Sequence, residues 1–123
     1  MYELKILAHF AAAHQLRGNK GGCERLHGHN WKVEVFVSGD KLDENGLLID
    51  FRDIKDKTAL LMEKFDHQFL NDLEPFVTLN PSSENISRHI FELLSHELNS
   101  DHIRVSKITV WESDSSCASY TAS

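Results

Sequence analysis

Two histidines, His27 and His29, stand two positions apart, four and six residues after Cys23. Side chains two apart on a β-strand point to the same face, so both imidazoles can aim at one point, and Gly28 leaves room beside them. Two imidazoles alone make a weak metal site, and a third ligand is needed. His14, in a segment that we expect to be irregular, is the nearest candidate. The spacing therefore suggests a three-histidine metal site.

Three histidines around a zinc ion leave one coordination position open for water or substrate, which separates a catalytic site from a closed structural one. Two other interpretations stay open. A His-x-His pair can arise by chance on a solvated strand, and the histidines can instead hold a structural metal.

Cys23 lies at the end of a glycine-rich stretch, residues 17–23, whose composition predicts a loop. A free cysteine most often behaves as a small buried hydrophobe. A loop cysteine close to a dication favours the thiolate form, however, and becomes a candidate base or nucleophile. The second cysteine, Cys117, is interpreted as structural.

Two further carboxylates stand in informative positions. Asp66 directly precedes His67 after a predicted helix, and an acid beside an imidazole can orient a proton-transfer group, although plain helix-end polarity is the more common reason for such a pair. Glu112 shares a predicted strand face with Ile108 and Val110, where a carboxylate needs a partner. It is either a rim residue or an acceptor for an N–H-rich heterocycle.

Alternation of apolar and polar residues predicts strands, and apolar residues at helical spacing predict two helices. Asp50 is expected to cap the first helix, and Pro81 precedes the start of the second. The expected strands cover residues 2–10, 29–39, 104–113 and, more weakly, 117–121, and the expected helices cover 51–65 and a segment from Ser82 or Ser83 to Leu98.

This order predicts one α+β domain over residues 1–123, with a four-stranded antiparallel sheet and both helices on one face. So small a sheet has exposed edges, and pairing with identical copies would protect them, so a homo-oligomer is expected.

The composition excludes several classes of protein. With 41% hydrophobic residues and no apolar run of membrane length, a soluble globular protein is expected, and no signal peptide is visible after Met1. Two cysteines are too few for a disulfide framework, so the expected compartment is the cytoplasm. A net charge of −6 argues against a general nucleic-acid surface. His9, His89, His96 and His102 lie in ordinary amphipathic contexts and are expected not to bind metal.

Six segments taken together in chain order resemble the family of 6-pyruvoyl-tetrahydropterin and 6-carboxy-tetrahydropterin synthases. The distance from cysteine to HGH, followed by the Asp-His and glutamate elements, makes the ordered set far more specific than any one motif. The segments are AAAH, CERLHGH, LLIDFRDIK, DHQFLN, NPSSEN and VWES.

The resemblance implies the tunnelling fold, with trimers paired into hexamers and active sites between subunits. It implies that His14, His27 and His29 bind catalytic Zn²⁺ and that Glu112 anchors the pterin ring. It also implies proton transfer by Cys23 together with Asp66 and His67, which would meet from different chains. These catalytic, substrate-binding and metal residues are expectations for the structure.

The substrate that the resemblance implies is 7,8-dihydroneopterin triphosphate. The short chain and the CERLHGH form look more like the members that make 6-carboxy-5,6,7,8-tetrahydropterin, acetaldehyde and triphosphate for queuosine biosynthesis. The alternatives are a 6-pyruvoyl-tetrahydropterin synthase of the tetrahydrobiopterin pathway and a non-catalytic module that binds a pterin or purine.

Overall fold

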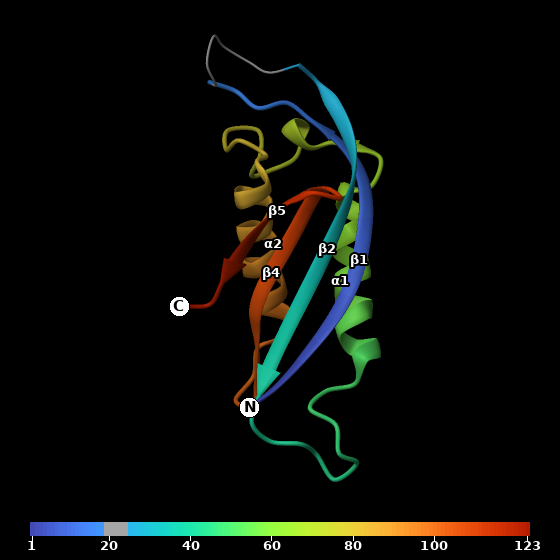
Figure 1. Ribbon diagram of the computed structural model, residues 1–123, viewed down its shortest axis with the longest axis vertical. Coiled ribbons are helices and arrows are strands. Elements are labelled where there is room, and N and C mark those ends of the chain that lie inside the picture. Colours follow the sequence, from blue (N-terminus) through green and yellow to red (C-terminus); the bar gives the residue numbers. More distant parts are fainter. Residues whose placement is uncertain (19–24) are drawn as a thin grey trace.

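Two long strands, β1 (Tyr2–His14) and β2 (His27–Gly39), pair antiparallel along their whole length. The structure is a computed structural model and describes residues 1–18 and 25–123. Both strands extend past the helices at the end of the molecule where the grey trace begins (Figure 1). The ladder is therefore both the centre of the sheet and the support of anything placed at that end.

The remaining elements complete an α+β fold with both helices on one face of the sheet, as the sequence predicts (Figure 1). Helix α1 packs on β1, and helix α2 packs on β4 and β5. These elements are α1 (Phe51–Phe65), β3 (Gln68–Phe69), a 3₁₀ turn η1 (Leu70–Asp72), α2 (Ser83–Leu98), β4 (Ile103–Ser113) and β5 (Ser116–Thr121).

In the part of the chain that the structure describes, the sheet has five strands in the order β3-β1-β2-β4-β5, one more than the four predicted. The additional strand, β3, runs parallel to β1, so the sheet is not purely antiparallel. Only two residues long, β3 is too short to show alternation. It forms because the backbone N–H of His67 donates to the carbonyl of Ala11 at 2.6 Å and brings the following residues alongside β1.

Strand β1 also runs four residues further than predicted and ends at His14. The expectation that His14 lies in an irregular segment is therefore wrong. Alanine has a weak preference for strands, so the run Ala11 to Ala13 hides the alternation. Pairing on both edges, with β2 and with β3, keeps this run extended.

Both helices begin where their capping residues predict. Asp50 accepts a hydrogen bond from the backbone N–H of Arg52 at 2.9 Å, and Ser82 accepts one from that of Asn85 at 3.1 Å. Each cap satisfies a donor that the first helical turn leaves free. The cap at Ser82 matters for the site, because it fixes the turn that leads into α2.

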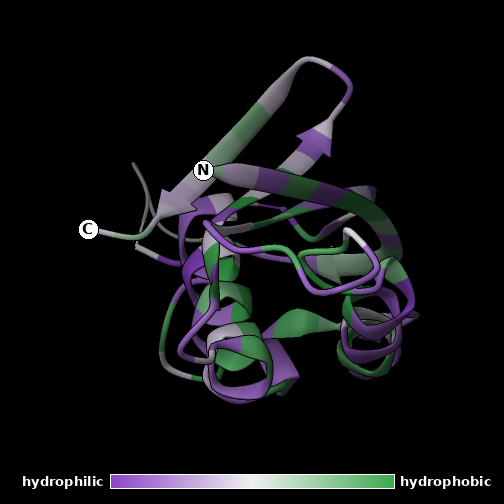
Figure 2. Cartoon of the chain, turned by 90° about the horizontal axis from the view of Figure 1, so that it is seen from below, coloured by the Kyte–Doolittle hydropathy of each residue, from purple (hydrophilic) through white to green (hydrophobic). Residues whose placement is uncertain are grey.

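The core lies between the sheet and the helices, which stand side by side beneath the curved strands (Figure 2). Trp31, Val33, Val35 and Val37 of β2 are fully buried, which confirms the predicted apolar face of that strand. Within the described residues, no helix has the length and hydropathy needed to span a membrane.

Candidate metal centre and adjoining cleft

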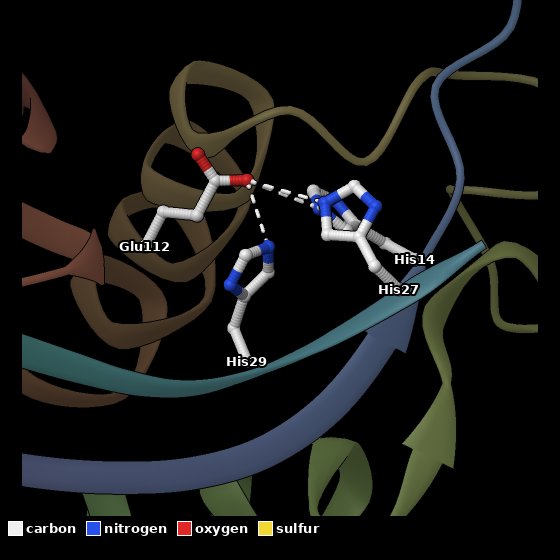
Figure 3. A group of neighbouring side chains, drawn as sticks. All are labelled: His14, His27, His29 and Glu112. Carbon is white, nitrogen blue, oxygen red and sulfur yellow. Dashed lines mark hydrogen bonds and ion pairs between the residues drawn. The ribbon is translucent and has the colours of Figure 1, made fainter. Parts of the chain in front are cut away.

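Three imidazoles converge at the end of the β1–β2 ladder (Figure 3). His14 lies directly opposite His27 in the ladder, and His29 follows on the same face of β2. The Nε2 atoms of His14 and His27 are 3.1 Å apart. The structure therefore brings together the three residues predicted to bind metal.

Backbone carbonyls fix the direction of two of these rings. The Nδ1 of His14 donates to the carbonyl of Pro81 at 2.7 Å, and the Nδ1 of His27 donates to the carbonyl of Arg25 at 2.8 Å. A carbonyl can only accept, so Nδ1 carries the proton and the Nε2 lone pair of a neutral ring is free. Such outer contacts are typical of metal-binding histidines, because they fix both tautomer and orientation.

The third ring, His29, has a buried nitrogen without a hydrogen bond. Among the described residues its Nε2 faces only the ion-pair contact with an oxygen of Glu112, which lies 3.1 Å away. Burial lowers the pKa of His29, against the opposing effect of the Glu112 carboxylate, and so favours the neutral ring that metals bind. A buried imidazole nitrogen is costly to leave unpaired, and a metal ion would satisfy it.

Trp31 forms the apolar support beneath the cluster. Its indole ring meets His14 and His29 edge-on, with centroids 5.0 and 5.2 Å away, and its N–H donates to the carbonyl of Ala12 at 3.2 Å. Phe10 stacks against the same indole at 5.7 Å. The histidines therefore rest on the hydrophobic core, which limits how far their rings can turn.

Glu112 joins the cluster, which sequence reasoning did not foresee. Its Oε1 lies 3.1 Å from the Nε2 of His14, 3.1 Å from that of His29 and 3.9 Å from that of His27. Its second oxygen points away from the rings (Figure 3). As predicted, Glu112 shares its strand face with the buried Val110.

The donor set suits a divalent metal. One atom from each of the four residues lies within 4.8 Å of all the others. Imidazole nitrogens with one carboxylate oxygen are the ligands that zinc commonly takes, and a set of three histidines leaves room for a non-protein ligand. The residues present therefore fit a metal ion.

A cleft of about 550 Å³ opens beside the cluster and is bordered by His27, His29 and Glu112. This volume falls in the range of small-molecule sites. Sequence reasoning did not single out its other walls, which combine an apolar, a cationic and two hydroxyl side chains: Leu16, Arg25, Ser113 and Ser116.

The Asp66-His67 pair lies outside both the cluster and this cleft. Asp66 accepts from the backbone N–H of Ala11 at 2.8 Å, and this hydrogen bond is the main reason that its pKa is lowered. Its other oxygen lies 3.0 Å from the Nδ1 of His67, whose side chain is 82% exposed. Acid and imidazole are therefore in contact, at the β1 edge of the sheet.

The two cysteines differ in what the structure says of them. Cys23 lies outside the described residues. Cys117, interpreted from sequence as structural, is instead an exposed free thiol on β5. It can therefore serve as an internal control for chemistry assigned to the other cysteine.

Comparison with known proteins gives one family. A family profile described as 6-pyruvoyl tetrahydropterin synthase matches residues 3–123. A relative from Archaeoglobus fulgidus, whose name assigns it provisionally to 6-carboxy-5,6,7,8-tetrahydropterin synthase, is 44% identical over 103 residues, which cover 83% of this chain and 84% of the relative. The 6-carboxy-5,6,7,8-tetrahydropterin synthase of Bacillus subtilis is 35% identical over 96 residues, 74% of this chain and 64% of its own.

Solved structures agree with this result. The 6-pyruvoyl tetrahydropterin synthase of Caenorhabditis elegans superposes with a TM-score of 0.84 at 25% identity, covering 99% of this chain and 96% of that one. The mixed sheet and paired helices of this chain are thus the tunnelling fold that these enzymes share.

The unpaired nitrogen of His29 gives a test that separates metal binding from stability. In His29→Phe we expect Zn²⁺ affinity to fall more than about 100-fold, because a ligand contributes more than the 10- to 100-fold of its outer contacts. The metal-free variant should be at least as stable as the parent, because a buried orphan nitrogen is removed. Calorimetric Zn²⁺ titration and thermal unfolding of the metal-free proteins measure the two effects.

His14→Phe is the matched control. It should also lose Zn²⁺, but it breaks the bond to Pro81 and should cost about 1 kcal/mol of stability without metal. The exposed His9, changed to Gln, should alter neither property. Unchanged Zn²⁺ affinity in His29→Phe would contradict the assignment of this residue as a ligand.

Proposed function

The chain belongs to the 6-pyruvoyl tetrahydropterin synthase family, and on that premise we propose that it is a zinc-dependent 6-carboxy-5,6,7,8-tetrahydropterin synthase. The reaction converts 7,8-dihydroneopterin triphosphate to 6-carboxytetrahydropterin, acetaldehyde and triphosphate. The observation that carries the proposal is the convergence of His14, His27 and His29 in a chain whose most similar relatives above bear that enzyme's name. We further propose that residues 1–123 act as one domain in the cytoplasm, on the route to queuosine.

We propose that the three histidines hold the zinc ion. When bound, the metal would supply Lewis acidity toward the hydroxyl oxygens of the substrate side chain, which would make the neighbouring C–H bonds more acidic. The carbonyls that accept from His14 and His27 keep both rings aimed at the metal, so little ordering remains to be done on binding. The cleft beside His27 and His29 receives the substrate.

Glu112 is proposed to anchor the pterin ring instead of closing the metal site. A carboxylate can accept two adjacent N–H groups, and a pterin presents such a pair on its pyrimidine edge. The second oxygen of Glu112 already points away from the histidines (Figure 3). Its side chain is 33% exposed, compared with 1% for His14, which leaves it freer to turn toward a ligand.

Proton transfer is proposed for Cys23 and for the Asp66-His67 pair. The hydrogen bond from Ala11 favours the carboxylate form of Asp66, and the other oxygen of this carboxylate orients the His67 ring through its Nδ1. His67 has a backbone φ of 60° and an exposed ring. Since His67 belongs neither to the cluster of its own chain nor to the cleft that Glu112 borders, we propose that it serves the site of a neighbouring subunit.

The sheet edges support a homo-oligomer. Strand β3 pairs only with Ala12 and Ala13, so the described structure leaves the preceding part of β1 as an open edge, and β5 forms the other edge. Long unpaired edges invite pairing with further strands. We propose that copies of this chain cover them in a hexamer built from two trimers.

The relative from Caenorhabditis elegans favours a second candidate, the 6-pyruvoyl-tetrahydropterin synthase reaction, because its enzyme shares the fold along the whole chain. Both reactions release triphosphate, but only the proposed one releases acetaldehyde. Mass analysis of the products from 7,8-dihydroneopterin triphosphate distinguishes the two. Tight binding of a pterin without turnover by the zinc-loaded protein would instead support a binding module.

Replacing the thiol that is proposed to transfer protons should nearly abolish turnover. In Cys23→Ala we expect triphosphate release to fall at least about 100-fold, because acid–base groups contribute roughly that much. Cys117→Ala, which changes an exposed thiol on β5, should retain full activity. Retained turnover in Cys23→Ala would remove this residue from the mechanism.

Mixing two inactive variants tests whether a site takes residues from two chains. Cys23→Ala and His67→Ala are unfolded together in equal amounts and refolded. Random assembly should give about a quarter of the parent activity, because an active site needs a chain that keeps Cys23 on one side and a chain that keeps His67 on the other. Each variant refolded alone is the control. If both residues come from one chain, the mixture stays inactive.

A further inference from the structure

The backbone that follows His14 continues in the direction of β1 but leaves the sheet. The ladder with β2 ends at the His14 and His27 pair, and the pairing with β3 ends at Ala13. The backbone groups of residues 15–17 therefore need other partners. Two asparagine side chains supply them.

Asn71 takes the place of a β3 residue. Its Oδ1 accepts from the backbone N–H of Gln15 at 2.9 Å, and its Nδ2 donates to the carbonyl of the same residue at 2.7 Å. Ala12 pairs with Gln68 and Ala13 with Phe69, so the same register would put Asn71 opposite Gln15. The chain has turned into η1 at that point, and a side-chain amide replaces the backbone pairing.

Asn80 repeats the arrangement two residues further along. Its Oδ1 accepts from the backbone N–H of Arg17 at 2.8 Å, and its Nδ2 donates to the carbonyl of Arg17 at 2.7 Å. The Arg17 guanidinium also donates to the carbonyls of Phe76 at 2.7 Å and Leu79 at 3.1 Å. Residues 15 and 17 thus present both backbone groups to one edge, as an extended strand does.

The same turn reaches the metal centre directly. The carbonyl of Asn80 accepts from the side chain of Asn85 in the first turn of α2, and the carbonyl of the next residue, Pro81, accepts from His14. The side chain of Asn80 therefore fixes the backbone of Arg17, while the carbonyl of the next residue, Pro81, fixes the ring of His14. The turn and the segment from His14 to Arg17 form one hydrogen-bonded unit.

We propose that Asn71 and Asn80 are positioning residues that fix the backbone after β1 and thereby preorganise His14 for metal binding. The inference rests on the proposed function but concerns two residues that touch neither metal nor substrate. Only a carboxamide offers a donor and an acceptor side by side, so asparagine suits both positions. Without the hydrogen bonds of these two asparagines, residues 15–17 and the carbonyl of Pro81 can move apart, and His14 loses its orientation.

The test is Asn80→Ala in the full-length, zinc-loaded protein, with zinc retention measured by competition with a chelator. Outer contacts of metal ligands contribute about 10- to 100-fold in affinity, so zinc should bind at least about 10-fold more weakly. In the Co²⁺-substituted protein, the visible absorption of the metal should also change, which a general loss of stability would not produce.

Asn99→Ala is the matched control. Asn99 also accepts from a backbone N–H, that of Val105 at 2.8 Å, but at the far end of α2. Its removal should lower the melting temperature without altering zinc affinity or the Co²⁺ spectrum. If Asn80→Ala does not fold, Asn80→Asp keeps the size and the acceptor but removes the donor, and the same criteria apply to it.

The outcomes separate this inference from the proposed function. If the parent binds zinc and turns over substrate while folded Asn80→Ala keeps the affinity and spectrum of the parent, the positioning role is wrong. An equal loss of zinc in Asn99→Ala would also overturn it. If the parent itself binds no zinc at the histidines, the proposed function fails first.

Discussion

The register between β1 and β2 is the constraint on which the site depends. It places His14 opposite His27 and Ala12 opposite His29, so one imidazole faces a second directly and a third diagonally, with a small side chain leaving room. A slip of one residue would turn every imidazole of one strand to the other face of the sheet. The register is fixed because the same ladder buries the valines of β2 and stacks Phe10 on Trp31.

Packing against the core therefore restricts the side chains of the site. Trp31 is the last fully buried large residue before the cluster, and its ring supports two of the histidines. His27 and His29 are partly exposed and His14 is buried, so the cluster meets solvent on one side and is held by packing on the other. The start of α2 adds the carbonyl of Pro81 to this support. The orientation of the imidazoles and the packing of the core thus depend on the same few residues.

Much of this arrangement follows from sequence patterns, and the exceptions have physical causes. The period of two in β2 identifies His27 and His29 as neighbours on one face, and the caps Asp50 and Ser82 locate both helices. The sequence does not predict the extended conformation at His14, because the alanines before it have a weak preference for strands. Pairing with β2 and β3 keeps them extended. The approach of Glu112 depends on how β4 aligns with β2, and no local pattern encodes that alignment. The hydrogen bonds of Asn71 and Asn80 are equally nonlocal, because their backbone partners lie 56 and 63 positions earlier in the sequence.

A crystal structure of the zinc-loaded protein tests the central claim most directly. The account predicts a single metal ion with the Nε2 atoms of His14, His27 and His29 at about 2.0 to 2.1 Å and a non-protein ligand in the remaining position. Glu112 should lie outside bonding distance and face the cleft. Imidazoles that turn away from one another, or a carboxylate oxygen of Glu112 bound at about 2.0 to 2.2 Å as a permanent fourth ligand, would contradict it.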